Sequence, residues 1–219
     1  MPRETRFGDD IYSFRTLHLI QQKVDVQPAE PKLNLIDIPG ANGSKDISEQ
    51  PAGRMMYKDR TITWTFALYP GDKWETKHAE VSNALNGLRC TIHLGTDWDW
   101  YYEGRLVVKE YNVDKALRQI TVEAICKPYK RKFALSGGDF DVTTERADIR
   151  LHNEQLPVVP DFYADVEAEI TWQGSSVVIA PGVWFSSLDI ELPKGESVIG
   201  LRATSAPGKV RILYREGSL

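Results

Sequence analysis

The residues of this chain that could do chemistry gather first in an acidic, aromatic stretch at 97–103, DWDWYYE. Paired carboxylates such as Asp97 and Asp99 could act as the acid and base of a glycosidase, and the aromatic rings among them could form a platform for a sugar. The same composition is typical of a hairpin turn that enters an aromatic strand, because Trp and Tyr are strand formers. Trp100 and Tyr102 would then share one face, and we favour this structural interpretation.

Other chemistry-bearing residues lack the spacing of a catalytic or metal site. The sequence has no Gly-x-Ser-x-Gly turn for a nucleophile and no closely spaced His and Cys pairs for zinc. We expect His78 in the core and His93 on the outward face of a strand. Asp139 and Asp141 follow two glycines but lack the further oxygen ligands of a calcium loop, so we expect a surface turn there. The sequence therefore predicts no catalytic residues, no metal, no cofactor and no enzyme.

The two cysteines, Cys90 and Cys126, are too few for a disulfide framework or a zinc site. Each falls on the apolar face of an alternating segment. We therefore expect two buried, reduced thiols that act as small hydrophobic side chains.

Composition and charge narrow the function classes further. The chain has 219 residues, of which 42% are hydrophobic and 26% charged, and its net charge is −4. Direct DNA binding is not expected, since it relies on Lys and Arg that neutralise phosphates, although DNA could pass such a surface without sticking. No apolar run approaches the roughly 18 residues of a membrane helix, and no signal peptide is visible. We expect assembly in the cytoplasm and no membrane contact.

The order of elements in the first half predicts a mainly β domain with one helix. The helix should begin with a capping box of Asp72 and Glu75 and carry one apolar stripe from Trp74 to Leu88. The expected strands are 11–26, 61–69, 88–94, 100–113 and 118–126.

A basic, Pro- and Gly-containing segment at 127–138, KPYKRKFALSGG, separates this half from the next. It is short within an acidic chain, so we interpret it as a solvated linker rather than a nucleic-acid patch. The second half contains only short strands divided by turn residues, which is typical of a β-sandwich. The predicted domains are 1–130 and 131–219.

A long polar excursion precedes the clean alternation of Thr61–Leu68. It follows the apolar run Leu33–Ile38, and its Pro and Gly residues prevent a central strand. We expect residues 40–60 to form an arm that reaches a neighbouring subunit, because Met55 and Met56 have no obvious partner in their own domain, and neither does Tyr57.

Several of these segments together resemble one family. The matching stretches are IDIPGANGSKDI at 36–47, YKDR at 57–60 before TITWTF, WYYEGR at 100–105 and ILYREGSL at 212–219. The chain resembles the distal tail proteins (Dit-type) of siphophages, the phages with long non-contractile tails, or of related prophages. The resemblance covers most of the chain in order. Ala41 departs from it, because family members often carry a basic residue there.

The resemblance implies a fold, an assembly and a set of partners. The fold is mainly β, with an N-terminal β-sandwich that carries one α-helix and a long β-hairpin arm, and a peripheral C-terminal galectin-like or carbohydrate-module-like β-sandwich. The implied structural role is a hexameric ring at the virion tail tip, around the DNA channel. The implied partners are the tail tube protein, the tape-measure protein, the tail-associated and baseplate proteins and the receptor-binding proteins. The residues expected at the subunit interface are Asn42, Lys45, Asp46, Met55, Met56, Tyr57 and Arg60.

An alternative function is a carbohydrate-binding module that recognises a host cell-wall glycan. The aromatic residues available for it in the second half are Tyr163, Trp172, Trp184 and Phe185. Each lies in an apolar strand, so we expect each in the core rather than on a sugar platform.

Overall fold

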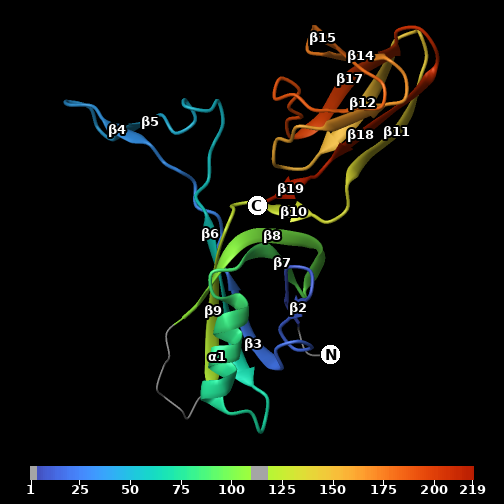
Figure 1. Cartoon of the computed structure of the whole chain (residues 1–219). Coiled ribbons are helices and arrows are strands. Elements are labelled where there is room, and N and C mark those ends of the chain that lie inside the picture. The colour runs from blue at the N-terminus through green and yellow to red at the C-terminus, as the bar shows by residue number, and fades with distance from the viewer. Residues whose placement is uncertain (1–3, 110–117) are drawn as a thin grey trace. The chain divides into compact units, whose positions relative to one another are not determined.

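A computed structural model describes residues 4–109 and 118–219 (Figure 1). The chain divides into two compact units, Met1–Lys130 with Leu219, and Arg131–Ser218. Each unit has its own cluster of buried hydrophobic residues. The predicted mainly β fold class is confirmed. The expected strand over 100–113 lies outside the described residues from 110 onward.

The first unit is built on one antiparallel sheet with the strand order β2-β1-β7-β8-β9-β6-β3. Strands β4 and β5 pair with each other in a separate two-stranded sheet. The bounds are β1 (Arg6–Phe7), β2 (Ile11–Tyr12), β3 (Leu19–Val26), β4 (Leu35–Asp37), β5 (Ser44–Asp46), β6 (Arg60–Leu68), β7 (Arg89–Leu94), β8 (Asp97–Val108) and β9 (Gln119–Cys126).

Strand β6 forms the centre of this unit, as the alternation of its residues predicts. Its even-numbered side chains from Ile62 to Leu68 are buried, whereas the threonines between them lie on the other face. Trp64 is fully buried, and its indole Nε1 donates a hydrogen bond to Thr5 Oγ1 at 3.1 Å. The indole therefore ties the amino-terminal segment to the central strand.

Helix α1 (Trp74–Leu85) packs one face against this core through Trp74, Lys77, Val81 and Leu85. The predicted capping box is wrong: Lys73 is the N-cap, and no side chain caps the helix. Asp72 lies one residue too early for that role, and its carboxylate instead approaches Lys77 Nζ at 4.0 Å. His78, expected in the core, is half-buried and stacks on the Trp74 ring with 4.7 Å between centroids.

The acidic, aromatic stretch at 97–103 enters strand β8, in agreement with its structural interpretation. Strand β7 has an irregular register between Ile92 and Leu94, and β1 pairs along it, with Arg6 opposite His93. His93 is therefore buried, which corrects the expected outward orientation. Its Nε2 lies 2.7 Å from an Arg6 guanidinium nitrogen, and its ring faces Trp98 and Tyr101.

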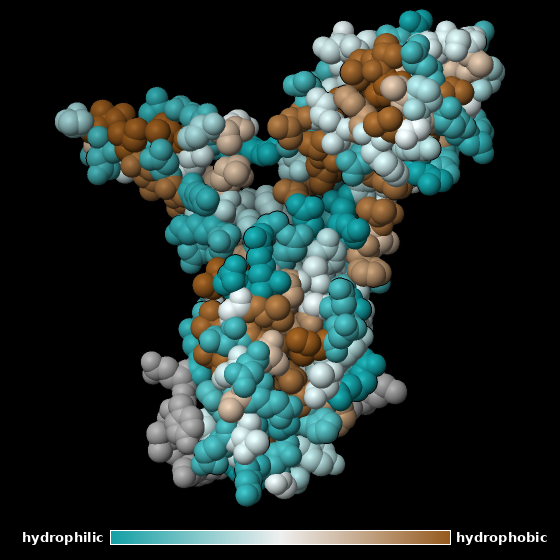
Figure 2. Space-filling model, viewed as in Figure 1, coloured by the Kyte–Doolittle hydropathy of each residue, from teal (hydrophilic) through white to brown (hydrophobic). Residues whose placement is uncertain are grey.

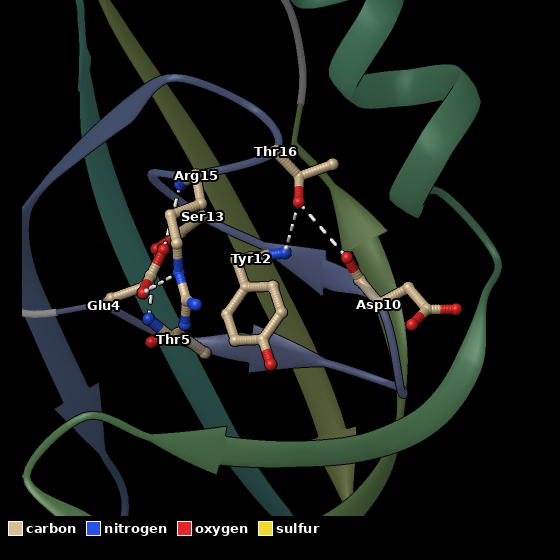
Figure 3. A network of polar contacts seen from close by, with 7 residues as sticks. All are labelled: Glu4, Thr5, Asp10, Tyr12, Ser13, Arg15 and Thr16. Carbon is tan, nitrogen blue, oxygen red and sulfur yellow. Dashed lines mark hydrogen bonds and ion pairs between the residues drawn. The ribbon is translucent and has the colours of Figure 1, made fainter.

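A polar network holds the first turn of the chain beside this cluster (Figure 3). The backbone N–H of Thr5 donates to Ser13 Oγ at 3.0 Å. Arg15 donates to the Glu4 carboxylate from both its backbone N–H and its Nε, each at 2.9 Å. These bonds fix the segment that leads into β3.

Both cysteines are free, as expected, and they flank Gly104 across three neighbouring strands. Cys126 is buried and Cys90 is half-buried. Desolvation raises the pKa of the Cys90 thiol to about 11 and that of Cys126 to about 12. Both therefore stay protonated and unreactive near neutral pH.

The second unit is a sandwich of two four-stranded antiparallel sheets, with the orders β11-β18-β13-β16 and β12-β17-β14-β15. Its core is formed by the inward-facing residues of the two sheets. The bounds are β11 (Ser136–Val142), β12 (Ala147–Asn153), β13 (Asp161–Ala164), β14 (Ala168–Trp172), β15 (Ser175–Ile179), β16 (Trp184–Phe185), β17 (Gly195–Ala203) and β18 (Gly208–Tyr214).

The expected linker at 127–138 contains β10 (Lys130–Lys132), which pairs with β19 (Gly217–Ser218), and the start of β11, and the boundary between the two units falls inside it. One expectation for the start of this unit is wrong. Asp139 and Asp141 do not form a turn. They lie within β11, where the cross-strand partners Arg211 and Lys209 compensate their charges.

The close packing around Gly104 yields a stability prediction. A Cβ at this position would lie 2.5 Å from Cys126 Sγ and 2.8 Å from the Ile125 carbonyl oxygen. Gly104→Ala should therefore lower the free energy of unfolding by about 1–3 kcal/mol through overpacking. Gly138→Ala is the matched control, because no atom lies within 4 Å of its Cβ position. Equal melting temperatures for the two variants would contradict this account.

The buried His93 predicts a pH dependence of stability. Desolvation and the Arg6 charge hold the pKa of His93 below its ordinary value of 6.5, so the ring stays neutral to a lower pH in the folded state than in the unfolded chain. The unfolded chain binds a proton there as the pH falls through about 6.5, and stability therefore decreases on acidification. His93→Gln should reduce the dependence of the free energy of unfolding on pH between about pH 7 and pH 5. The exposed His152→Gln should keep the wild-type slope.

Candidate functional site

The most unusual feature of the first unit is a projecting arm, which we define as residues 31–57. Its base is closed by a bridge between Pro31 and Tyr57 and by backbone bonds on either side. The Lys32 N–H donates to the Met56 carbonyl, and the Lys58 N–H donates to the Glu30 carbonyl, both at 2.8 Å. The arm thus starts earlier than the predicted segment 40–60.

Strands β4 and β5 form a small hairpin within the arm (Figure 1). Leu35 pairs with Asp46, and Ile36 pairs with Lys45. The connecting turn holds Gly40 at φ 83° and Gly43 at φ 77°, values that glycine adopts without steric cost. The turn residues that marked this segment in the sequence therefore close a hairpin.

Ser48 fixes the inner end of the hairpin. It is buried, and its Oγ accepts the Asn34 N–H at 2.7 Å and donates to Asp46 Oδ1 at 2.5 Å. The Ser48 N–H donates to the same carboxylate oxygen at 2.8 Å. These two bonds lower the pKa of Asp46, so its carboxylate stays charged. We call the hydrogen bonds among Asn34, Asp46 and Ser48 the clasp of the arm.

Hydrophobic side chains on the hairpin have no core to enter. Every residue from 30 to 46 is exposed. Adjacent side chains of a strand point to opposite faces, so Leu35, 55% exposed, and Ile36, 47% exposed, place apolar groups on both faces of the ribbon. Leu33 and Ile38 extend this surface, and Figure 2 shows hydrophobic residues gathered on the hairpin. An isolated two-stranded sheet, with no other element packed on either face, is only marginally stable in water.

The predicted interface residues occupy different environments. Asn42 lies at the exposed tip, Lys45 lies on β5, and Asp46 bonds to Ser48. Met56 is exposed, whereas Met55 is half-buried. The first three therefore belong to the hairpin, and the methionines lie near its base.

Tyr57 and Arg60 have partners within the first unit. The Tyr57 ring contacts that of Tyr129 in a T-shaped pair with 5.8 Å between centroids, so the expectation that Tyr57 lacks a partner in its own domain is wrong. Arg60 is buried, and its guanidinium lies over the Tyr102 ring. These two residues anchor the arm to the sheet.

Sequence reasoning missed the apolar residues of the hairpin itself. It placed the apolar run Leu33–Ile38 before the arm rather than in it, although the run LNLIDI places hydrophobic residues on both faces. A strand that contacts a core on one side has a stricter alternation. This irregular pattern was the available signal.

The aromatic residues that could serve the alternative glycan-binding function also differ in burial. Trp172 is buried, and Tyr163 and Phe185 are half-buried. Trp184 is 52% exposed, which contradicts its expected place in the core. Among the described residues, no group of His, Cys, Asp or Glu could hold a metal ion, and no helix there is long and apolar enough to cross a membrane.

Comparison with solved structures decides the fold. The structure of the SPP1 Dit (gp 19.1) protein superposes with a TM-score of 0.68 and covers 99% of each chain at 15% sequence identity. This chain has the Dit fold. The predicted resemblance to the Dit-type proteins is thus confirmed at the level of the fold. The SPP1 Dit protein is described as a paradigm of the hub adsorption apparatus of phages that infect Gram-positive bacteria. No family model and no curated protein matches the sequence.

The clasp at Ser48 yields a prediction about the arm. Ser48→Ala removes the acceptor of the Asn34 N–H and one of two bonds to Asp46. A hydrogen bond contributes about 0.5–1.5 kcal/mol, so amide exchange at residues 34 and 46–48 should accelerate roughly two- to tenfold. The melting temperature should hardly change, because the hairpin adds no core. Exchange that matches wild type would contradict the clasp. Ser44→Ala is the control, because it removes a different hairpin bond, from Ser44 Oγ to Asp37 Oδ1, and should leave exchange at residues 34 and 46–48 unchanged.

Proposed function

We propose that this chain is a structural protein of a siphophage tail tip, a distal tail protein that forms a ring through its arm. The observation that carries the proposal is the likeness to the SPP1 Dit protein, a hub component, over 99% of both chains. A fold retained over both units supports a similar architectural role. The two-unit likeness fits a hub better than an isolated binding module.

The arm supplies the contact that an assembly requires. Its apolar side chains are exposed on both faces of the hairpin, so laying one face on any single surface would leave the other in water. Burying a Leu or Ile side chain fully contributes about 1.5–3 kcal/mol, and about half of that remains available for side chains near 50% exposed. Insertion between surfaces of a neighbouring copy would recover this energy.

Repetition of one such contact produces a closed assembly. The arm of each copy would bind a different surface on the next copy, which is a head-to-tail interface. Such interfaces give a ring when the rotation between copies closes. We expect a hexamer at the virion tail tip, assembled in the host cytoplasm, as the resemblance to distal tail proteins implies.

The ring would connect several tail components and surround the DNA path. The proposed partners are the tail tube and tape-measure proteins on one side, and the tail-associated, baseplate and receptor-binding proteins on the other. The net charge of −4 supports passage of DNA without tight binding. No catalytic step is part of this role.

Removal of the arm tests the proposal. Residues 33–55 can be replaced by a short Gly/Ser turn, because the Lys32 N–H already bonds to the Met56 carbonyl at the base. The shortened chain should keep its circular dichroism and melting temperature but become monomeric by light scattering, whereas the wild type should form a ring. A ring of unchanged mass after the replacement would exclude the arm as the closing contact, and a monomeric wild type would contradict the assembly itself.

Point variants separate the hydrophobic contact from the length of the arm. Leu35→Ser with Ile36→Ser should weaken the ring without affecting the fold, since both side chains lie outside the core. Val178→Ser with Val198→Ser is the matched control, because these residues are similarly exposed in the second unit. Equal loss of the ring in both pairs would contradict a specific role for the hairpin.

A further inference from the structure

The second unit presents an exposed tryptophan in a place where the sequence predicts a core residue. Trp184 belongs to strand β16 at one edge of the sheet β11-β18-β13-β16. Its neighbour Phe185 packs against the core, so the alternation of the strand directs Trp184 to the outer face. About half of the surface of Trp184 is open to solvent.

Trp184 is the end of a row of four side chains that crosses the whole sheet. Tyr163 pairs with Trp184, Arg211 pairs with Tyr163, and Asp139 pairs with Arg211. The residues that flank this row on β18 and β13, such as Val210, Ile212 and Phe162, are buried, so the four row residues share the outer face. Three strand spacings give the row a length of roughly 14 Å.

The row joins aromatic faces to fixed polar groups. The Tyr163 and Trp184 rings lie 5.3 Å apart between centroids, tilted by 45°. Arg211 donates to both carboxylate oxygens of Asp139, at 2.6 Å and 2.9 Å, which orients the guanidinium and the carboxylate in advance. Both groups keep about half of their surface exposed, so each has donor or acceptor capacity left for a ligand.

We propose that this row, Asp139–Arg211–Tyr163–Trp184, is a binding site for an extended, neutral sugar chain. The electron-rich ring faces attract the polarised C–H groups on the apolar side of a sugar ring. The guanidinium and carboxylate bind the hydroxyl groups that project from its edge. The length of the row suits a short stretch of chain that lies flat across the strands.

Charge on this face argues against polyanions. Arg211 is paired with Asp139, and Lys209 lies 3.8 Å from Asp141. A nucleic acid or an acidic polymer binds through cations that are free to neutralise it, and these two are already compensated. A hydroxyl-rich neutral ligand needs only the directed hydrogen bonds that the pair still offers. The proposal is independent of ring formation.

The test is native affinity electrophoresis of the full chain in gels that contain hydroxyethylcellulose or galactomannan, two soluble neutral polysaccharides. The wild-type protein should be retarded by at least one of them. Trp184→Ala should weaken retardation at least tenfold, and Arg211→Ala should weaken it several-fold. Trp98→Ala, a comparably exposed tryptophan of the first unit, is the control and should bind like the wild type. Circular dichroism establishes that each variant is folded.

Several results would overturn the proposal. These are absence of retardation of the wild type by both polysaccharides, retardation that survives in Trp184→Ala, or equal loss in Trp98→Ala. Light scattering provides a further check. A change in assembly mass on Trp184→Ala, with sugar retardation unaffected, would assign this face to a protein contact instead.

Discussion

The first unit depends on strand β6, whose alternate side chains from Ile62 to Leu68 are all buried. The strand pairs with β3 on one side and β9 on the other, so its position determines the register of the central sheet. Through Trp64 and Thr5 it also secures the start of the chain. The arm runs directly into this strand, and the buried Arg60 marks the point where the exposed segment joins the core. A firmly held strand thus carries a hairpin that has no core of its own.

The arm has an ordered backbone, but its hydrophobic side chains are exposed to solvent. Glycines close its turn, and the clasp of Ser48 and Asp46 holds its inner end, so the backbone is organised before any partner binds. Organisation in advance reduces the entropy lost on association. The hydrophobic side chains remain exposed, as the proposed subunit interface would require.

The two faces of the sheets in the second unit differ in character. The inward faces form a core in which alternate residues of β14, β17 and β18 are buried. The outward face of β11-β18-β13-β16 carries cross-strand ion pairs and the exposed Trp184. The ion pairs are exposed and add little stability. Their consequence is geometric, because they hold polar groups in a fixed orientation beside aromatic rings.

The sequence alone determined the features that follow from local periodicity. The pleat of a strand has a period of two residues, so Thr61–Leu68 was readable as a half-buried strand, and turn residues were sufficient to indicate an arm. Tertiary structure decided what depends on non-local neighbours. His93 is buried because β1 pairs along β7, and Asp139 lies in a strand because β11 pairs with β18. Trp184 is exposed because it faces away from the core side of an edge strand, and Leu33–Ile38 lacks cover because β4 pairs with β5 alone. Burial is a property of the surfaces that the fold brings together, and a single segment does not contain that information.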